Sequence, residues 1–424
     1  MSKIVLLPHG TAGDVLPYIW MGRQLQRCGH RVTMIWVESF QAAAEGAGLD
    51  YIPMLDAGFE ELLRNPALWQ PHKGLQVGFA YAGNCMGKYL DAFATSLARD
   101  GVPDMLVAPH INFAARLLRE KHDVPLISVV LYPLAFISAY EIAGGMLAAR
   151  WLRMLPLVMR RIILSSVMPY DHFAMPQVRR HCLEHGVKPP RNLQRDWWLS
   201  HDGVLALFPA WYGKPQPDWP ANCLQWDFPL EDLSGEKPLP SELLAFLDRG
   251  DKPVVFTLGT GSLHARAFFE TAAELCSRLG CRGVFVTRDP SQAPASLPST
   301  ICVTTYAPFS ALLPRARVFV HHGGIGTLSQ CFKAGLPQFI VSMNFDQPDN
   351  AERLERFNAG VGLDIRKFTV ERAAPLLRRC LEDEGIRRGA AACAERMIQN
   401  RPPVTQLVEW LEDRMRRPAT NPPS

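Results

Sequence analysis

Residues 318–327 read VFVHHGGIGT, and this stretch decides the fold of the 424-residue chain. An apolar run rich in valine passes through a glycine-rich turn, and a helical pattern begins at about Thr327. Glycine lets a phosphate approach the backbone, and a helix start offers unpaired N–H groups with a positive dipole end. Strand, turn and helix together favour an anion-binding site in an α/β fold, although such turns also serve tight packing.

The sequence after this turn carries polar side chains suited to a sugar. A second apolar run, 338–341, is followed by Ser342-Met343-Asn344-Phe345-Asp346-Gln347. A carboxylate and an amide at one strand end can accept hydrogen bonds from hydroxyl groups and donate to them. A helix cap at Asp346 is the alternative interpretation.

The same alternation of short apolar runs and helical patterns fills both halves of the chain. Runs near 3–7, 31–37, 105–108 and 126–131 alternate with helical patterns, and the alternation restarts at 253–258. This pattern predicts α/β architecture with two doubly wound, Rossmann-like domains facing across a cleft, with ligands at the carboxyl ends of parallel strands. The expected boundaries are an N-terminal domain at 1–215, a proline-rich linker at 216–250, a C-terminal domain at 251–401, and a helix and tail at 402–424 that pack back on the N-terminal domain.

The composition is that of an ordinary globular protein. Hydrophobic residues make up 48% and charged residues 20%, with a formal net charge of +4, so neither disorder nor a dominant nucleic-acid-binding surface is expected. The ten cysteines include no C-x-x-C pair, which argues against a disulfide scaffold or structural zinc and favours a reducing cytoplasm. The apolar stretch 124–140 carries no charged residue but contains two prolines, which argues against a membrane span.

Four short motifs resemble those of one enzyme family. Tyr306-Ala307-Pro308, His322-x-Gly324 and Asp346-Gln347-x-x-Asn350-Ala351 resemble the donor-binding signature of family 1 glycosyltransferases, and Gly13-Asp14-Val15-Leu16-Pro17 resembles the G-D-x-x-P loop of bacterial members. The resemblance covers nearly the whole chain. It implies the GT-B fold, an N-terminal domain that binds the acceptor, a C-terminal domain that binds a nucleotide sugar, and an inverting, metal-independent hexosyl transfer.

The resemblance also implies roles for individual donor-site residues. The nucleotide base would lie against Tyr306, Ala307 and Pro308. The donor diphosphate would be held by residues of two glycine turns and the following helix: Thr260, His322, Gly324, Gly326 and Thr327. The sugar hydroxyls would bind Asp346 and Gln347. Gln330 departs from the family, since many plant members place a glutamate there on the ribose.

In the first half of the chain, Asp14 would be the general base that takes the proton of the acceptor hydroxyl. His9 and His110 are further candidates for assisting it, and a helix cap is the alternative role for Asp14. No metal or other cofactor is expected beyond a dTDP- or UDP-linked sugar as co-substrate. The chain contains no D-x-D motif, which agrees with metal independence.

Two features point to different donors and acceptors. Residues 207–211, 218–220 and 228–230 are similar to rhamnosyltransferases of rhamnolipid biosynthesis, which implies L-rhamnose from dTDP-rhamnose and a lipid-like acceptor such as a hydroxyacyl ester. The pair His321-His322 instead resembles deoxysugar transferases of antibiotic pathways and some sterol glucosyltransferases. A UDP-glucose-dependent transferase acting on a small hydrophobic natural product or sterol-like aglycone is therefore the alternative. A binding protein that has lost turnover is an alternative of another class.

The stretch 124–169 is apolar and methionine-rich, and it carries Arg150, Arg153, Arg160 and Arg161. One interpretation is an acceptor tunnel beside a basic helix that touches anionic lipid, which would make the protein cytoplasmic and peripheral on a membrane. The other is a core helix with a solvated arginine face. The nearby His181-x-x-Glu184-His185 has the spacing of a zinc peptidase motif, but no third ligand is evident, so a solvated helix is favoured.

Overall fold

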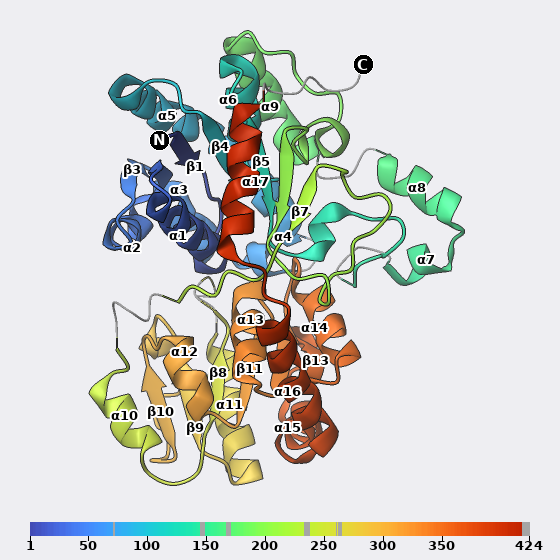
Figure 1. Ribbon diagram of the computed structural model, residues 1–424. Helices are drawn as coiled ribbons and strands as arrows, with labels where there is room; N and C mark the ends of the chain where they lie inside the picture. The colour runs from blue at the N-terminus through green and yellow to red at the C-terminus, as the bar shows by residue number, and fades with distance from the viewer. Residues whose placement is uncertain are drawn as a thin grey trace.

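The computed structural model describes residues 1–70, 73–144, 149–166, 171–232, 238–259, 261 and 265–417. Two parallel β-sheets, each covered by helices, form two domains that lie one above the other in Figure 1. The predicted pair of doubly wound α/β domains is therefore confirmed. Within the described residues, no helix is both long and apolar enough to span a bilayer.

The N-terminal domain is built on seven strands. They are β1 (Lys3–Leu6), β2 (Arg31–Val37), β3 (Asp50–Met54), β4 (Met105–Pro109), β5 (Leu126–Val130), β6 (Gly203–Ala206) and β7 (Cys223–Gln225). Their order in the sheet is β3-β2-β1-β4-β5-β6-β7. The helices around them are α1 (Ala12–Arg27), α2 (Gln41–Gly46), α3 (Ala57–Arg64), α4 (Lys73–Asn84), α5 (Met86–Asp100), α6 (Phe113–His122), α7 (Ala149–Met154), α8 (Leu157–Ser165) and α9 (Asp171–Glu184).

The C-terminal domain is built on six strands. They are β8 (Val254–Thr257), β9 (Gly283–Val286), β10 (Ile301–Thr304), β11 (Val318–His321), β12 (Gln338–Ser342) and β13 (Gly360–Asp364). Their order is β10-β9-β8-β11-β12-β13. The helices are α10 (Ser241–Leu247), α11 (Arg266–Leu279), α12 (Phe309–Leu312), α13 (Ile325–Ala334), α14 (Gln347–Arg356), α15 (Val370–Glu382) and α16 (Glu384–Gln399), and α17 (Val404–Arg416) follows.

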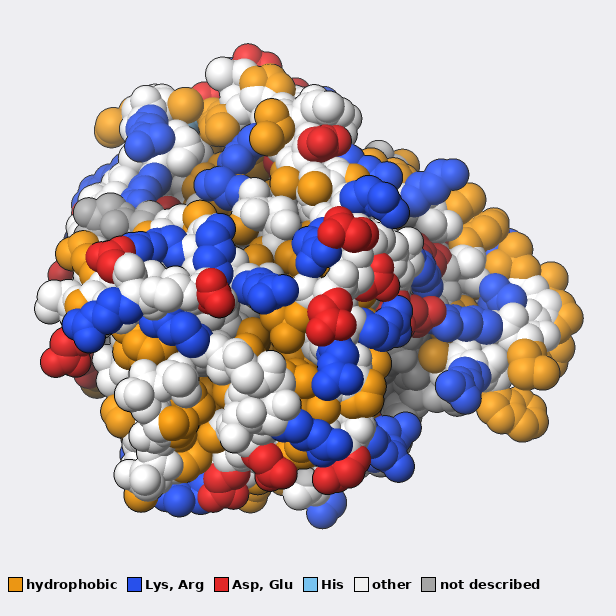
Figure 2. Space-filling view, turned by 90° about the horizontal axis from the view of Figure 1, so that it is seen from below, with side chains coloured by type: hydrophobic (Ala, Val, Ile, Leu, Met, Phe, Trp, Pro, Cys, Tyr) orange, Lys and Arg blue, Asp and Glu red, His pale blue; other side chains and the backbone are white. Residues whose placement is uncertain are grey.

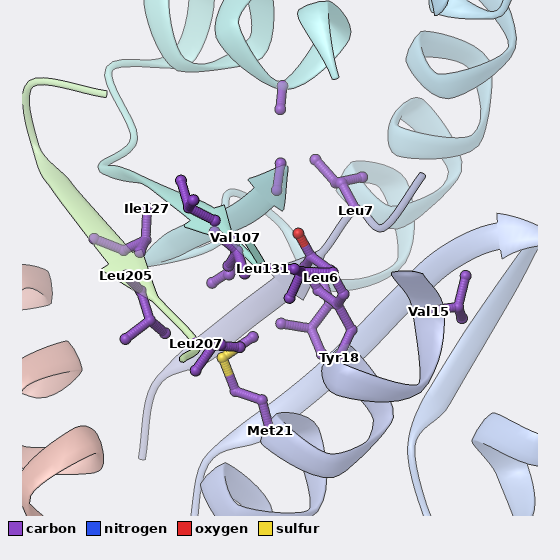
Figure 3. Packing of buried hydrophobic residues seen from close by; sticks show 14 of the residues in the cluster. Leu6, Leu7, Val15, Tyr18, Met21, Val107, Ile127, Leu131, Leu205 and Leu207 are labelled. Carbon is purple, nitrogen blue, oxygen red and sulfur yellow. The ribbon is translucent and has the colours of Figure 1, made fainter. Parts of the chain in front are cut away.

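Burial on both faces explains why the central strands are continuous apolar runs. Every residue of β8 and β11 is buried, as expected for parallel strands covered by helices on both sides. In the N-terminal domain, Figure 3 shows Leu6 and Val107 of adjacent strands close to Tyr18 and Met21 of α1. This packing fixes the start of α1 at the carboxyl end of β1.

Both sheets reverse their strand order at an equivalent place. The reversal lies between β1 and β4 in the first sheet and between β8 and β11 in the second. In open parallel sheets, ligands bind just beyond the carboxyl ends of the strands at this point. The loops after β4, β8 and β11 contain His110, Gly259 and His322, and the loop after β1 leads into the first turn of α1, which contains Asp14. The topology and the sequence motifs therefore indicate the same turns.

The predicted linker, 216–250, is too long. Its first part contains β7, which pairs with β6 at the edge of the N-terminal sheet, and its last part contains α10, which packs in the C-terminal domain through Leu243 and Leu247. Prolines are compatible with an edge strand, so the proline-rich composition concealed both elements. The N-terminal sheet therefore extends beyond residue 215, to Gln225.

Helix α17 returns to the N-terminal domain, as Figure 1 shows. Leu407, Val408 and Leu411 are buried in the core of that domain, and Glu412 lies 3.0 Å from the ring of His30. The chain therefore crosses twice between the domains, which restricts how they can move relative to each other.

Candidate active site

Asp14 lies in the first turn of α1, and its side chain folds back on the loop before the helix. The backbone N–H of Thr11 donates to Oδ2 of Asp14 at 2.9 Å, and the Thr11 hydroxyl is 3.3 Å from the same oxygen. A Cβ on Gly10 would collide with this carboxylate, and Gly10 has φ of 120°, so glycine is required there. Capping is therefore one real role of Asp14, and it leaves Oδ1 without a hydrogen-bond partner among the described residues.

Three candidate groups share an unusual position: Asp14, His322 and Asp346 are each partly exposed, yet protein surrounds them closely enough to shift their pKa values. Burial raises the pKa of Asp14 to about 6 against the lowering effect of the Thr11 hydrogen bonds. Burial lowers the pKa of His322 to about 4. Side chains that protein surrounds closely, but that are still partly exposed, are candidates for contact with a small molecule.

The two adjacent histidines of the β11–α13 turn have different surroundings. His321 is fully buried, with Nε2 2.9 Å from Oε1 of Gln338 and Nδ1 accepting the N–H of Gly323 at 3.1 Å. These bonds fix the turn. His322 has a buried Nδ1 without a partner in the described chain, and a Cβ on Gly324 would lie 2.5 Å from its Nε2. His322 is thus the member of the pair placed to meet a ligand.

The start of α13 is open. Gly324 is the N-cap residue and provides no side-chain hydrogen bond to the helix, whereas the start of α1 is closed by Thr11 and Asp14. The first N–H groups of α13, which include those of Gly326 and Thr327, have no acceptor within the helix. An anion at this end would find these donors, the helix dipole and His322 together.

The open end of α13 faces the start of α1 across the domain boundary. A methyl group built on Gly326 would lie 3.9 Å from Cα of Gly13. Nearby, one built on Gly261 would lie 3.1 Å from Thr11. The start of α1, which carries Asp14, and the anion-binding turn before α13 therefore lie opposite each other.

Asp346 brings a second carboxylate to this junction. Burial first and the negative charge of Asp14 second raise the pKa of Asp346 to about 7, because two nearby carboxylates resist ionising together. Asp346 is the N-cap residue of α14, but its side chain makes no capping bond. The capping interpretation therefore does not explain this carboxylate, which is available for a ligand hydroxyl.

Asn350 holds Asp346 in place, and sequence reasoning did not give it a role. Its Nδ2 donates to Oδ2 of Asp346 at 2.7 Å and to the carbonyl of Gly323 at 2.8 Å. Its Oδ1 accepts the hydroxyl of Tyr212, from the N-terminal domain, at 2.6 Å. The motif spacing from Asp346 to Asn350, one helical turn, was the signal for the first bond, but nothing in the sequence pointed to Tyr212.

One end of the Gln347 side chain is hydrogen-bonded within the protein. Its Oε1 accepts the N–H groups of Met343 at 2.8 Å and Asn344 at 3.2 Å, and the residue is buried. Only the amide N–H₂ end therefore remains for the predicted contact with a sugar hydroxyl. The carbonyl end fixes the loop between β12 and α14.

The residues predicted to flank the nucleotide base lie together after β10. The hydroxyl of Tyr306 donates to the carbonyl of Asp232 at 2.8 Å, and Ala307 and Pro308 are buried. The tyrosine ring is partly exposed, so it can offer one edge of a flat binding surface. Thr260, predicted to meet the diphosphate, lies outside the described residues.

Aromatic side chains form a wall beside Asp14 in the N-terminal domain. The ring of His110 lies 4.4 Å from that of Trp198 and 6.2 Å from that of Tyr132, and the charges of Asp346 and Asp14 both act on Tyr132. Burial lowers the pKa of His110 to about 3 and that of His9 to about 4. Both histidines are therefore neutral, and within the described residues neither is hydrogen-bonded to Asp14.

Comparison with known proteins places these features in context. A family model described as Erythromycin biosynthesis protein CIII-like, C-terminal domain, matches residues 284–413. The O-mycaminosyltylonolide 6-deoxyallosyltransferase of Streptomyces fradiae is 27% identical over 97% of this chain and 98% of its own length. The sterol 3-beta-glucosyltransferase of Candida albicans is 25% identical over 90% of this chain and 26% of its own length.

Solved structures agree with the domain arrangement. The spinosyn rhamnosyltransferase complexed with thymidine diphosphate has a TM-score of 0.65 and 19% identity, covering 97% of this chain and 100% of that one. None of these matches identifies the rhamnosyltransferases of rhamnolipid biosynthesis. With two Rossmann-like domains and glycosyltransferase relatives along almost its whole length, the chain is a glycosyltransferase of the GT-B fold.

Proposed function

We propose that this protein transfers a 6-deoxyhexose, L-rhamnose from dTDP-rhamnose in the first instance, to a hydroxyl group of a hydrophobic acceptor, with inversion at the anomeric carbon. One observation carries the proposal: Asp14 of one domain faces Asp346 and the open start of α13 of the other. A base, a hydroxyl-binding carboxylate and an anion-binding turn are the three groups that such a transfer requires.

The donor would lie with its diphosphate at the start of α13. Gly324, Gly326 and Thr327 provide the helix end, and His322 lies beside it with one ring nitrogen unpaired. Asp346 and the amide end of Gln347 would bind the sugar hydroxyls, while Tyr306 would lie against the base. A relative named as a deoxyallosyltransferase and a structural neighbour with bound thymidine diphosphate favour a deoxysugar on a thymidine nucleotide.

In the chemical step, the acceptor oxygen forms a bond to the anomeric carbon as the bond from that carbon to the diphosphate oxygen breaks. Asp14 takes the proton of the acceptor hydroxyl on Oδ1, the oxygen that its capping bonds leave unused. General-base assistance of this kind is typically worth about 10²–10⁴-fold. Its raised pKa of about 6 makes Asp14 a stronger base than an exposed aspartate while keeping most of it ionised at neutral pH.

The departing nucleoside diphosphate carries a new negative charge, which the N–H groups and dipole of α13 would stabilise. We propose that no metal ion is needed for this step, in keeping with the lack of a D-x-D motif. Turnover that is unchanged by a chelator is the expected result, and a loss restored by magnesium would contradict it.

The aromatic wall made by His110, Tyr132 and Trp198 suits an apolar acceptor whose hydroxyl reaches Asp14. A hydroxyacyl ester is the first candidate. The likeness to a sterol 3-beta-glucosyltransferase favours a second candidate, a UDP-glucose-dependent transfer to a small hydrophobic or sterol-like alcohol.

A two-step assay separates these candidates. Thermal unfolding is first measured with dTDP, UDP and GDP at one concentration. The proposal expects the largest stabilisation with dTDP, since at equal concentration the ligand with the lowest Kd stabilises the folded state most. Product formation is then followed by mass spectrometry with dTDP-rhamnose and UDP-glucose, each with a hydroxyacyl ester and with a sterol. Stabilisation by UDP alone with glucosyl transfer would replace the first candidate by the second, and binding without any transfer would favour a non-catalytic protein.

A further inference from the structure

Helices α7 and α8 form a hairpin that projects from the side of the N-terminal domain (Figure 1). Of the eleven large hydrophobic side chains exposed in the described part of the chain, six lie on this hairpin. They are Trp151, Met154, Val158, Met159, Ile162 and Ile163. A contiguous apolar surface of this kind usually marks an interaction site, whereas isolated exposed apolar residues do not.

The exposed face is additional to a buried one. Ala149, Leu152 and Leu164 are buried and pack with Ala139 and Ile142, so the hairpin already has an inner apolar face that attaches it to the protein. The core-helix interpretation of this region accounts for that inner face alone. The outer face needs a different explanation.

The charges that the hairpin segment itself carries have one sign. Between Ile142 and Tyr170 the sequence has four arginines and no acidic residue. Arg153 and Arg160 both bond to other residues of the protein. Arg153 pairs with Glu352 at 2.7 Å, and Arg160 donates to the carbonyl of Arg153 at 2.6 Å.

The other two arginines, Arg150 and Arg161, are exposed. The guanidinium of Arg161 lies over the ring of Tyr140 at 5.2 Å. Arg161 also lines a cavity of about 400 Å³ at the base of the hairpin, whose wall includes Leu164, Arg195 and one carboxylate, that of Asp218. Positive charge and apolar surface therefore occur together at this edge of the molecule.

We propose that the outer face of the α7–α8 hairpin docks on a bilayer that contains anionic lipid. Apolar side chains next to arginines, with a tryptophan among them, are the composition of an interfacial membrane-binding helix. At six and nine residues, the helices lie in the interface and do not cross it. Anionic head groups would supply the negative partner that Arg150 and Arg161 do not have among the described residues.

The shape of the hairpin favours a membrane over a second folded protein. Figure 2 shows it standing out from the body of the molecule, with hydrophobic side chains along its outer edge and basic ones beside them. A stable protein–protein contact needs a broad complementary surface of about 800 Å² on each partner, which a narrow projection provides poorly. A fluid bilayer adapts to such a projection.

Membrane docking has a consequence for the acceptor, and only this consequence rests on the proposed function. The chain runs from the aromatic wall at Tyr132 through 133–136 into Ile137 and Ala139 at the base of the hairpin. Docking would therefore bring the acceptor side of the cleft toward the source of a membrane-dissolved acceptor. Membrane binding itself requires neither donor nor acceptor, so the two proposals fail separately.

The test is sedimentation of the purified full chain with vesicles of phosphatidylcholine, alone or mixed equally with phosphatidylglycerol. Wild type is expected to bind the mixed vesicles more tightly. The variant Trp151→Ser/Met154→Ser/Ile162→Ser is expected to bind them about tenfold or more weakly, since each change removes apolar area from the contact. Leu183→Ser/Ile398→Ser, which changes apolar residues that are 66% and 80% exposed elsewhere, is the matched control and is expected to bind as wild type does.

A second variant tests the contribution of the two exposed arginines to vesicle binding. Arg150→Gln/Arg161→Gln is expected to lose the preference for phosphatidylglycerol while stabilisation by dTDP is unchanged, which reports an intact donor domain. Absence of wild-type binding to either vesicle, or equal binding by the triple serine variant, would overturn the proposal. So would a wild-type dimer that the triple variant converts to monomer, since the surface would then serve a second copy of the chain.

Discussion

His322 and its neighbour His321 are adjacent in sequence, but they should respond to substitution in opposite ways. His322→Ala is expected to weaken stabilisation by dTDP and to lower kcat/KM about 10–100-fold, because it removes a donor from the diphosphate site. Its unfolding temperature without ligand should change little, since Nδ1 has no partner in the described chain.

The control is His321→Ala, which breaks the bonds to Gln338 and Gly323. Two lost buried hydrogen bonds are expected to cost about 2–4 kcal/mol of stability. Thermal unfolding with and without dTDP separates the two effects. If His322→Ala destabilises the ligand-free protein as strongly as His321→Ala does, then His322 is structural and the assignment is wrong.

Asp346 is predicted to lower the stability of the ligand-free protein at alkaline pH. Its pKa is about 7 in the folded protein, against 3.8 for the ordinary side chain, so the folded state binds the proton more tightly than the unfolded state does. The stability that this group contributes is therefore complete below about pH 4 and is lost as the pH rises to about 7. Asp346→Asn is expected to stabilise the protein by about 1–3 kcal/mol at pH 8 and by much less at pH 5.

Asp364→Asn is a control that is expected to change the stability at pH 8 in the opposite direction. The Arg366 guanidinium holds the pKa of this carboxyl below its usual value, so Asp364→Asn should cost stability at pH 8, although only slightly because the pair is exposed. Thermal unfolding at the two pH values measures both. A loss of stability at pH 8 in Asp346→Asn would show that the carboxylate is held by favourable contacts instead.

The sequence identified functional residues that belong to short motifs. It did not identify residues whose role depends on contacts made by the folded chain. Asp14 and Asp346 belong to short motifs and could be singled out, but their mutual effect could not, since they lie 332 positions apart in the sequence. Tyr212 and Tyr132 have no motif. Their importance comes from contacts that only the packing of two domains creates.

At the scale of elements, the loop between β1 and α1 depends on one glycine. Gly10→Ala is expected to reduce activity about as strongly as loss of the Asp14 carboxylate, because its Cβ would displace that carboxylate. Gly101→Ala shares the positive φ, 74° against 120°, but its Cβ would have only the end of Lys3 nearby, at 3.8 Å.

Both substitutions should therefore cost about 1 kcal/mol from backbone strain, and only Gly10→Ala should reduce turnover. Initial rates and thermal unfolding of the two variants, measured side by side, test this. Full activity in Gly10→Ala would show that the carboxylate position is not critical.

Central strands with continuous apolar runs were found from sequence, whereas the edge strands β3, β7 and β13 were not. The buried strands β8 and β11 are continuous apolar runs, so their identity was evident. The edge strands β3 and β7 contain or follow proline, and β13 contains two glycines, so their composition resembled that of loops. Edge strands are defined by the neighbour they pair with, and one sequence does not show that neighbour.

For the molecule as a whole, Tyr212 is predicted to couple the domains to the donor site. Its hydroxyl crosses the boundary to Asn350, which holds Asp346. Tyr212→Phe should leave Oδ1 of Asn350 unpaired and cost about 1–3 kcal/mol of stability. It should also raise the KM for the donor several-fold, since Asp346 would lose part of its support.

Tyr51→Phe is the matched control. The Tyr51 hydroxyl is also buried and donates to the carbonyl of Val37 at 2.7 Å, but entirely within the N-terminal domain. A similar loss of stability with an unchanged donor KM is expected. Equal KM values in the two variants would show that the boundary bond serves stability alone.

The central claim is that the cleft between the domains is a catalytic site with Asp14 as its base, and Asp14→Asn tests it most directly. The substitution keeps an oxygen to accept the N–H of Thr11 and removes the basic group. We predict that kcat for sugar transfer falls about 10²–10⁴-fold, that dTDP still stabilises the variant, and that the wild-type loss of kcat/KM below about pH 6 disappears from the residual activity. Near-normal turnover by folded Asp14→Asn protein would contradict the account.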